Sequence, residues 1–449
     1  MQELRLGIDV ACAEHHRAAL ADQTGRLIWS NRRFRTVSGQ LEALWAAVCA
    51  AGTGPVTVVM EPTRNAWVPL AAWLRARGAV VRMVPPEQSA DLRKYYNKHA
   101  KTDRLDCELL ARLPLLHPDG LLATPGLGPA EALRRAVAHR ASLVARRTAG
   151  LQRLEALLEL LGPGWAAALG SEPGKAALVV LEHYADPHAL RRLGRARLIR
   201  LLVRASRGMW REEKADELLA AAAETLQLWP PDAIDFAELG EDIAAEARLI
   251  AGLTGEIEAL EDRIAGHYQA ADPAGIVASV PGVGPTLAAA ILGRLGDAKR
   301  FTDLAAVRNY TGLVPKVDQS GVSDKRPGLT KAGDHLLRQA LFLAADHARK
   351  IDPTLANRYR RLRAAGKHHN SALCTLAAVL VTRIAACWRT DQPYQLRDLD
   401  GRSITEAEGR AICAALGPNT GTGRRSKESH SAPSTGPSTT ETRSPSKTA

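Results

Sequence analysis

The hydrophobic and polar positions of this chain follow two periods, and the change between them divides the sequence. Up to about residue 84, short apolar or alternating runs such as LRLGIDVA, RAALAD, VTVVM and AVVRMV are separated by segments with helical spacing. Such runs predict strands, and their alternation with helices predicts an α/β region. Three closely joined strands, followed by two that helices separate, give the order expected of a ribonuclease-H-like sheet.

Helical spacing dominates after the linker HPDGLLATPGLGP, and the first helices are strongly basic. Residues 131 to 161 predict one arginine-rich helix. A second amphipathic helix places its arginines opposite leucines, so that one face can pack while the other meets phosphates. An ordinary helix with a solvated basic face has the same pattern. The candidate nucleic-acid-binding residues of this second helix are Arg197, Arg200, Arg204 and Arg207.

Residues 235 to 268 carry an apolar repeat of seven residues. Leucines occupy two of the intervening d positions, and this combination favours a two-stranded coiled coil. The a positions are Ile243, Ile250, Ile257 and Ile264. We therefore hypothesise that Ile250 and Ile257 lie at a protomer interface, with packing inside one chain as the alternative.

The stretch SVPGVGPTLAAAIL predicts a tight turn at the start of a helix, inside a mainly helical C-terminal region. With a short helix predicted over residues 274 to 279, the pattern resembles a helix-hairpin-helix element. The backbone N–H groups near Gly282 and Gly284 would then bind a DNA phosphate without any base being recognised. A simple turn between packed helices is the alternative.

A polar segment, VDQSGVSDKRPG, follows and leads into another amphipathic helix. Ser320 lies in this segment, which we predict to be a loop, and Ser323 is a competing candidate. A serine hydroxyl attacks phosphorus only when its proton is removed and the developing charge is stabilised, and cationic neighbours supply the second need. The cations in or beside this segment are Lys316, Lys325, Arg326 and Lys331.

Four acidic residues occupy positions that an α/β layout brings together. Asp9 lies late in the first strand, Glu61 follows VTVVM, and Asp103 and Asp106 lie three apart on a predicted helix. Strand ends share one edge of a sheet, and hard oxygen ligands clustered there suit Mg²⁺, with Mn²⁺ as a substitute. Taken singly, each residue also fits a helix cap or a solvated position. Together they predict a metal site at which phosphodiester chemistry takes place.

Composition and charge indicate what kind of molecule the protein binds and where in the cell it is expected. The 449 residues carry a formal net charge of +12, with 46% hydrophobic residues, which predicts several globular domains and a polyanionic partner such as nucleic acid. The six cysteines are dispersed without a CxxC pair, and the N-terminus carries early charges. We therefore expect a cytoplasmic, nucleoid-associated protein with no membrane segment. Beyond Gly417, a Gly, Ser, Thr and Pro-rich composition predicts disorder.

Taken together, these motifs resemble the DEDD-type transposases of the insertion-sequence family numbered one hundred and ten. The resemblance covers nearly the whole chain to about residue 400. It rests on GIDVA, VVMEPT, KTDRLDCELLARL, VPGVGPTLAAAIL, RFTDLAAVRNYTGLVP, QSG and LTKAGDHLLRQAL, in the order of the family. Asp334 departs from the pattern, because Asn is expected there, and the tail lies outside it.

The resemblance implies an α/β plus all-α architecture. A RuvC-like DEDD domain with its basic helix would span residues 1–160, a helical and coiled-coil region 161–270, a C-terminal transposase domain 271–400, and a disordered tail 401–449. It implies Ser320 as the nucleophile. It also implies composite active sites in a dimer or tetramer, and a structured bridge RNA that pairs with donor and target DNA, so that the protein recognises backbone and shape.

Two functions remain open at this stage. The first is a transposase, a site-specific DNA recombinase that cuts and rejoins strands by Mg²⁺-assisted serine attack. The second is a RuvC-like Holliday-junction resolvase or nuclease that hydrolyses DNA with metal-activated water and forms no covalent bond to it. A non-catalytic scaffold is disfavoured because all four acidic positions are present.

Overall fold

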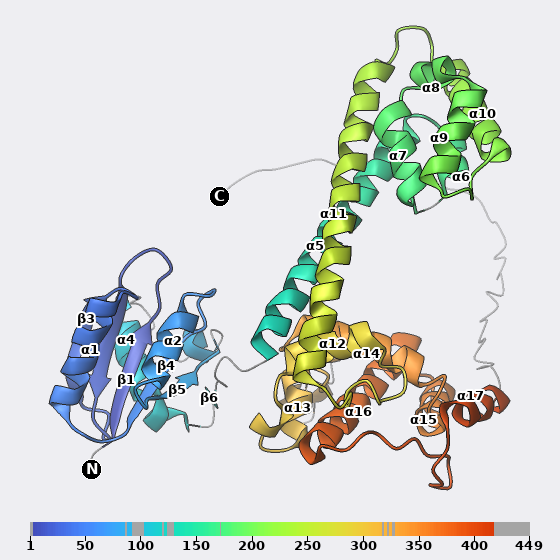
Figure 1. The fold of residues 1–449 in the computed structure, drawn as a ribbon. Helices are drawn as coiled ribbons and strands as arrows, with labels where there is room; N and C mark the ends of the chain where they lie inside the picture. Colours follow the sequence, from blue (N-terminus) through green and yellow to red (C-terminus); the bar gives the residue numbers. More distant parts are fainter. Residues whose placement is uncertain are drawn as a thin grey trace, which may run out of the picture.

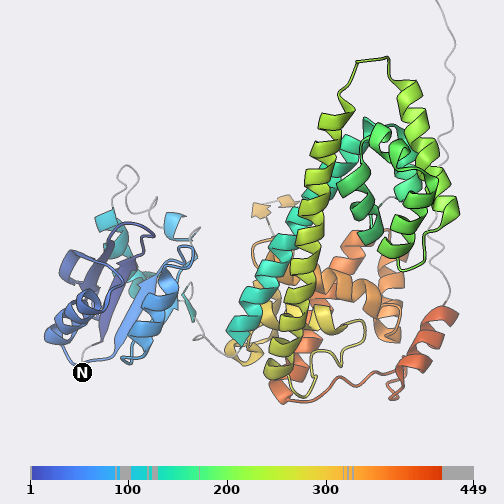
Figure 2. The same ribbon diagram turned by 45° about the horizontal axis from the view of Figure 1, so that its top comes forward.

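A computed structural model describes residues 3–85, 88–91, 103–118, 121–123, 130–170, 172–316, 318–320, 323–325 and 328–416. It contains one sheet-based body at the N-terminal end of the chain and a helical region that follows (Figure 1). Two long helices form the spine of the helical region, and a group of shorter helices surrounds each end of this spine (Figure 2). The predicted division into an α/β part and a helical part is confirmed.

The N-terminal body is built on a six-stranded sheet in the order β3-β2-β1-β4-β5-β6. β1 pairs antiparallel with β2 and parallel with β4, β2 pairs antiparallel with β3, and β4 pairs parallel with β5. The strands are β1 Leu4–Asp9, β2 His16–Ala21, β3 Leu27–Phe34, β4 Val56–Met60, β5 Val80–Met83 and β6 Leu122–Ala123. The runs that the pattern predicted as strands are therefore strands.

Helices cover both faces of this sheet. α1 (Ser38–Ala51) and α2 (Trp67–Arg75) share a core with Leu6, Ile8 and Met60 on one face. α4 (Asp103–Leu116) lies on the other face, against β1, β2 and β4. Side chains of a strand alternate between faces, so the two cores use alternate residues of the same strands. This double coverage explains why the central strands are apolar throughout.

The spine consists of α5 (Ala130–Glu159) and α11 (Phe236–Ala271), which lie side by side. Two ion pairs show that they run antiparallel, because Arg140 pairs with Glu261 near one end and Arg153 with Glu246 nearer the other. The arginine-rich helix therefore packs with the helical region. The helices between them are α6 Pro163–Leu169, α7 Lys175–Tyr184, α8 Pro187–Leu193, α9 Arg195–Ala205 and α10 Glu212–Leu228.

The isoleucine repeat of α11 is buried as predicted, but its partner is this chain. Ile250 is 1% exposed and Ile257 is 4% exposed in the single chain. Ile250 joins a core formed with α5 to α10, and Ile257 joins the core at the opposite end of the spine. The hypothesis that these two residues form a protomer interface is wrong, because a seven-residue apolar stripe packs equally well on a helix of the same chain.

The second helical core contains the remaining elements. They are α12 Pro285–Leu295, η2 Ala298–Arg300, α13 Leu304–Thr311, β7 Asp318–Ser320, β8 Ser323–Lys325, α14 His335–Ala348, α15 Pro353–Ala364, α16 His369–Thr390 and α17 Glu406–Ala415. α16 has the length and hydropathy to span a membrane, with 44% of the tested window buried inside the protein. It packs against α14, α13 and α15, as expected of a core helix.

Two predicted features of this region are corrected. Residues 274 to 279 form turns, because the Asp272 carboxylate accepts the backbone N–H groups of Ile276 and Val277, and Gly275 has a φ of 65°. The first helix of the predicted helix-hairpin-helix is therefore missing. The predicted disordered tail of residues 401–449 includes an ordered helix, α17, which begins with a capping box between Thr405 and Glu408. Residues from 417 onward lie outside the described residues.

Candidate active site

The ends of two neighbouring parallel strands place two of the predicted carboxylates side by side. β1 and β4 pair with Ile8 opposite Met60; Asp9 is the last residue of β1, and Glu61 directly follows β4. Both strands therefore end at the same edge of the sheet. This is the position at which open α/β sheets hold ligands.

Strand alternation places both carboxylates on the face that α4 covers. Gly7 lies against α4, because a Cβ there would come within 2.3 Å of the Cys107 carbonyl oxygen. Val59 shares a buried cluster with Leu110 of the same helix. Asp9 and Glu61 each lie two residues further along, so each occupies the same face as Gly7 and Val59.

α4 runs antiparallel to β1 and brings its N-terminal turn to the same edge. At its far end, Arg112 donates a hydrogen bond of 3.2 Å to the carbonyl of Gly25, in the turn between β2 and β3. Asp106 is 8% exposed and lies one turn before Leu110, on the stripe that faces β4. Asp103 is the first residue of α4, and its side chain lies outside the described residues.

The electrostatics of this edge support the placement of the carboxylates. Burial raises the pKa of the Cys107 thiol to about 11, and the charges of Glu108 and Asp9 add to the rise. Asp9 therefore lies near the first turns of α4. The Glu108 carboxylate accepts hydrogen bonds from Ser30 and from Arg104, which lower its pKa against the opposing effect of burial.

The donors at this edge fit a divalent cation by their chemistry, because oxygen ligands from carboxylates are what Mg²⁺ and Mn²⁺ prefer. Within the part of the chain that the structure describes, no group of three or more His, Cys, Asp or Glu side chains lies close enough to hold one ion. Asp103, whose side chain is not among the described ones, follows the same helical face as Asp106.

Ser320 lies at the end of a strand, which corrects the predicted loop. β7 and β8 pair antiparallel, and Ser320 is directly opposite Ser323. The two candidate serines are therefore cross-strand neighbours next to the hairpin tip. Gly321 and Arg326, which the sequence associated with this segment, lie outside the described residues, as do the side chains of Ser320 and Lys325.

The base of this hairpin is held rigidly on α13 and α14. Lys316 donates its backbone N–H to the Gly328 carbonyl at 2.7 Å. Gly333 adopts a φ of 137°, and a Cβ there would come within 2.4 Å of the Tyr310 carbonyl oxygen. Arg338 also donates to the Thr311 carbonyl at 2.9 Å. These contacts hold the residues on both sides of the hairpin against α13 and α14.

Asp334, the residue that departs from the expected Asn, has a defined role at this base. Its carboxylate caps α14 by accepting the Leu337 N–H at 3.0 Å. It also accepts a 2.8 Å hydrogen bond from Nε of Arg294 on α12. Asn would preserve the cap but not the ion pair. The side chain therefore joins α12 to the start of α14, immediately after the hairpin.

The predicted basic face of α9 is exposed. Leu198 and Leu202 are fully buried, whereas Arg197, Arg200 and Arg204 are exposed on the opposite side of the helix. Arg207 is also exposed and follows the end of α9. Among the residues that the structure describes, none of the four forms an ion pair with an acidic side chain.

A second basic surface, on α15, was not identified from the sequence. Arg358, Arg361 and Lys367 are exposed, and residues 353–367 contain no acidic residue. The signal in the sequence was the run NRYRRLRA, which carries four arginines and no acidic residue. We refer to residues 358–367 as the α15 basic surface.

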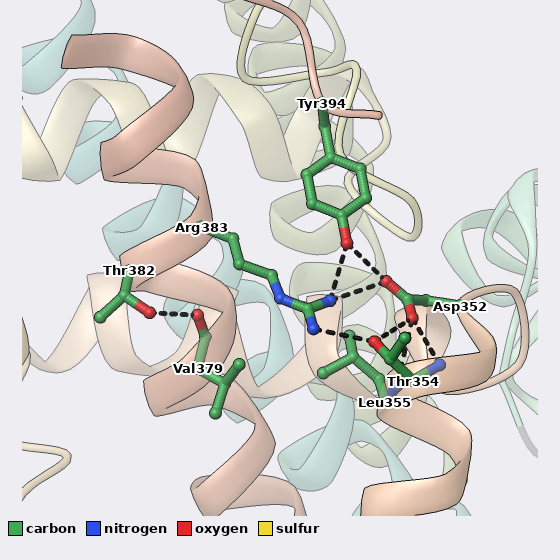
Figure 3. Close-up of polar contacts among 7 residues, drawn as sticks. All are labelled: Asp352, Thr354, Leu355, Val379, Thr382, Arg383 and Tyr394. Atoms are coloured by element: carbon green, nitrogen blue, oxygen red, sulfur yellow. Dashed lines mark hydrogen bonds and ion pairs between the residues drawn. The ribbon is translucent and has the colours of Figure 1, made fainter. Parts of the chain in front are cut away.

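A buried polar network anchors the start of α15 (Figure 3). The Asp352 carboxylate, 1% exposed, accepts hydrogen bonds from Arg383 at 2.7 Å and from Tyr394 at 2.8 Å. It also caps α15 through the N–H groups of Thr354 and Leu355. Burial and the Asp352 charge raise the pKa of Tyr394, so the phenol stays protonated and donates. The network fixes α15 against α16.

The turn before α12 has a packing role. Gly282 adopts a φ of 82°, and a Cβ there would meet backbone atoms of Ala348 at 2.4 Å. This close approach to α14 explains the glycine without a ligand. Gly284, at the exposed N-terminus of α12, would have no atom within 4 Å of an added Cβ. Lys316 and Lys331, at the base of the hairpin, are exposed.

Comparison with known proteins gives two family matches in chain order. Residues 6–163 match the transposase family named DEDD_Tnp_IS110. Residues 274–360 match the transposase family IS116/IS110/IS902. The first match covers the strands and the helix that carry the four carboxylates, and the second covers the hairpin that carries Ser320.

Relatives extend the similarity over most of the chain. The 43.6 kDa protein of insertion element IS110 from Streptomyces coelicolor is 27% identical over 395 residues, which are 87% of this chain and 95% of the relative. The mini-circle putative transposase for IS117 from the same species is 27% identical over 421 residues, covering 86% and 94%. A pilin gene-inverting protein of Moraxella bovis is 28% identical over 128 residues, covering 28% of this chain and 39% of the relative.

Proposed function

Because the chain belongs to the IS110 family of DEDD transposases and is a DNA transposase, we propose that Asp9, Glu61, Asp103 and Asp106 hold its divalent metal as Mg²⁺. One observation carries this assignment. Asp9 and Glu61 end neighbouring parallel strands on the face that α4 covers, and Asp106 lies in the first turns of that helix. These carboxylates would hold a divalent ion, which would supply stabilisation of the negative charge on phosphate and leaving oxygens during strand cleavage.

We propose Ser320 as the nucleophile. Its Oγ forms a bond to the scissile phosphorus as the bond from phosphorus to the departing deoxyribose oxygen breaks. The serine proton passes to a base, and the departing oxygen takes up a proton. The phosphodiester energy is retained in the protein–DNA ester, so a second strand can be joined without ATP. Support comes from the fixed base of the hairpin and from the exposed cations Lys316 and Lys331 beside it.

We propose that a structured bridge RNA selects donor and target DNA. The α9 arginines and the α15 basic surface are exposed cationic faces without a base-reading motif, which suits contact with nucleic-acid backbone. Base pairing would then supply the sequence choice. Because the serine hairpin and the carboxylates belong to separate bodies of the chain, the proposal includes a dimer or tetramer in which different protomers complete one active site. We place this activity in the cytoplasm.

The sheet supports the finer fold assignment. Three antiparallel strands followed by two parallel strands, with helices on both faces, fit a RuvC or ribonuclease-H-like domain. We propose that this domain ends before α5, because α5 packs on α11 and α12. Residues 130–271 then form the spine with its first core, and residues 272–416 form the serine-bearing transposase domain.

The deciding experiment separates covalent recombination from simple hydrolysis. A DNA suicide substrate, in which the cleaved strand loses its far end, should trap the full-length protein on DNA. Ser320→Ala should abolish the adduct while DNA and RNA binding persist, and Ser323→Ala should still form it. Mass spectrometry identifies the linked residue. Cleavage without any adduct would establish the resolvase or nuclease alternative. A nucleotide found on Ser323 would make that residue the nucleophile in place of Ser320.

A parallel experiment tests the carboxylates. Asp9→Ala removes one oxygen ligand and should abolish metal-dependent cleavage, while binding of DNA and RNA largely persists, since backbone contact depends less on the metal. RNA that co-purifies with the full chain should be sequenced in the same preparation. Normal cleavage by Asp9→Ala would refute the metal assignment, and the absence of a defined RNA would refute guidance.

A further inference from the structure

The carboxylate edge of the sheet continues into a pair of arginines. β1 and β2 pair with Asp9 directly opposite Arg17, and β2 and β3 pair with Arg17 directly opposite Arg33. Glu61, which directly follows β4, extends this line of charged residues on the other side of Asp9. The row begins with two carboxylates and ends with two arginines.

All four residues occupy the face of the sheet that α4 covers. Ala18 and Phe34 belong to the core on the opposite face, whereas Ala19 and Ala21 contact Cys107 on α4. Arg17 alternates with Ala18, and Arg33 alternates with Phe34. Both arginines therefore share the face of Asp9 and Glu61.

The arginine end of the row is accessible. Arg33 is exposed and forms no ion pair within the part of the chain that the structure describes. Arg17 is half-buried and donates a hydrogen bond to the side chain of Asn31, which directs its guanidinium toward β3. Two cationic groups therefore lie together beside the carboxylates.

We propose that Arg17 and Arg33 form a phosphate-binding subsite for the DNA strand that is being cut. Neighbouring strands lie ~4.8 Å apart, so the backbone of Arg33 lies ~10 Å from that of Asp9. This length lets one DNA strand place a phosphate at the carboxylates and a neighbouring phosphate at the arginines. The scissile phosphate lies at the carboxylates, and the arginines bind phosphates that flank it. This subsite rests on the proposed role of the carboxylates.

Guanidinium groups suit this task. Arginine forms bidentate hydrogen bonds with phosphate and retains its charge at every working pH. The contact also has a positioning consequence. A strand anchored on the arginine side reaches the carboxylates in one register, and misplacement by about 1 Å costs roughly a hundredfold in rate. An alternative role for Arg17, as the counter-ion of Asp9 alone, gives Arg33 no function.

The test measures DNA binding by the full chain with its co-purified RNA, in the presence of EDTA, so that the readout does not require the metal. Arg33→Gln should weaken binding of a duplex carrying the element's own terminus roughly tenfold. The slope of log affinity against log salt concentration should fall by about the amount expected for one lost phosphate contact. Arg32→Gln is the matched control, because Arg32 pairs with Ala18 in the register and lies over the Trp29 ring at 5.6 Å. It should bind as the parent protein does.

Neutral methylphosphonates locate the contact. Replacing single phosphates near the scissile position should weaken binding by the parent protein at one or two flanking positions. At those positions the methylphosphonate should not weaken DNA binding by Arg33→Gln any further. The substitution and the modified DNA each remove the same contact between arginine and phosphate. The subsite is overturned if Arg33→Gln binds as Arg32→Gln does, or if every methylphosphonate weakens the two proteins equally. Asp9→Ala in the same series separates the proposals, because its cleavage activity tests the carboxylates independently of this binding result.

Discussion

The close approach of Gly7 to the backbone of α4 offers a sharp test of how the candidate active site is assembled. Gly7 lies beneath α4, and a Cβ built on it would come 2.2 Å from the Ala111 nitrogen and 2.3 Å from the Cys107 oxygen. Both atoms are backbone, so no side chain can rotate away. An ordinary van der Waals contact needs 3.4 Å or more. Gly7→Ala must therefore move α4 away from β1 by about 1 Å.

Two measurable effects follow from this displacement. Overpacking of this kind typically costs ~1–3 kcal/mol of folding stability. The second effect is specific to the site, because α4 carries Asp106 while β1 carries Asp9. A shift of about 1 Å between ligands costs on the order of a hundredfold in rate. Gly7→Ala should thus lose far more cleavage activity than its lowered stability explains.

The assay compares strand cleavage, Mn²⁺ binding by calorimetry and thermal melting in Gly7→Ala and in a control, Gly39→Ala. Gly39 lies in α1 with no atom within 4 Å of its Cβ position, so the control should keep the parent's activity. All measurements are made well below the melting temperature of the variant. Cleavage and Mn²⁺ affinity equal to the parent's, at normal stability, would show that the separation of β1 and α4 does not position the carboxylates.

Three further variants test other contacts. Ile257→Asp should lower stability by more than ~3 kcal/mol without altering the mass measured by light scattering, because the residue is buried within its own chain; a shift to a smaller mass with unchanged melting would contradict this. Arg383→Met should cost ~3–5 kcal/mol in urea unfolding, since it leaves Asp352 buried without its cation, and a loss below ~1 kcal/mol would contradict the network. Gly333→Ala should slow formation of the covalent adduct while leaving Mn²⁺ binding intact, and adduct at the parent's rate would show that the hairpin base is not held by this backbone contact.

The sequence predicted those features that have a local periodic signal. Alternating and apolar runs became the strands of the sheet, and the seven-residue repeat became the buried stripe of α11. The stripe could not reveal its partner, because α5 in the same chain and a helix in another chain offer similar apolar surfaces. The folded chain identifies the partner, because α11 shares its buried cores with α5 and the two helices are joined by ion pairs such as Arg153 with Glu246.

Features that depend on strand register could not be predicted from the sequence. The four carboxylates could be grouped as a candidate site because strand ends and helical spacing are visible in a single chain. The alignment of Arg17 with Asp9, and of Arg33 with Arg17, requires the pairing of three strands, including a bulged pair. The hairpin that carries Ser320 was expected to be a loop, because its strands, DQS and SDK, are short and polar and carry no apolar alternation.

The carboxylates and the serine hairpin are positioned by the same physical device. In each case a glycine lets two backbone segments approach more closely than any side chain allows: Gly7 beneath α4, and Gly333 against the carbonyl of Tyr310. Contacts between backbones are less adaptable than contacts between side chains, because neither partner has a rotamer to change. Under the proposed function, damage at Gly7 should impair metal binding, whereas damage at Gly333 should impair adduct formation. Nucleic-acid binding through the α9 arginines and the α15 basic surface, which lie on other elements, should survive both changes.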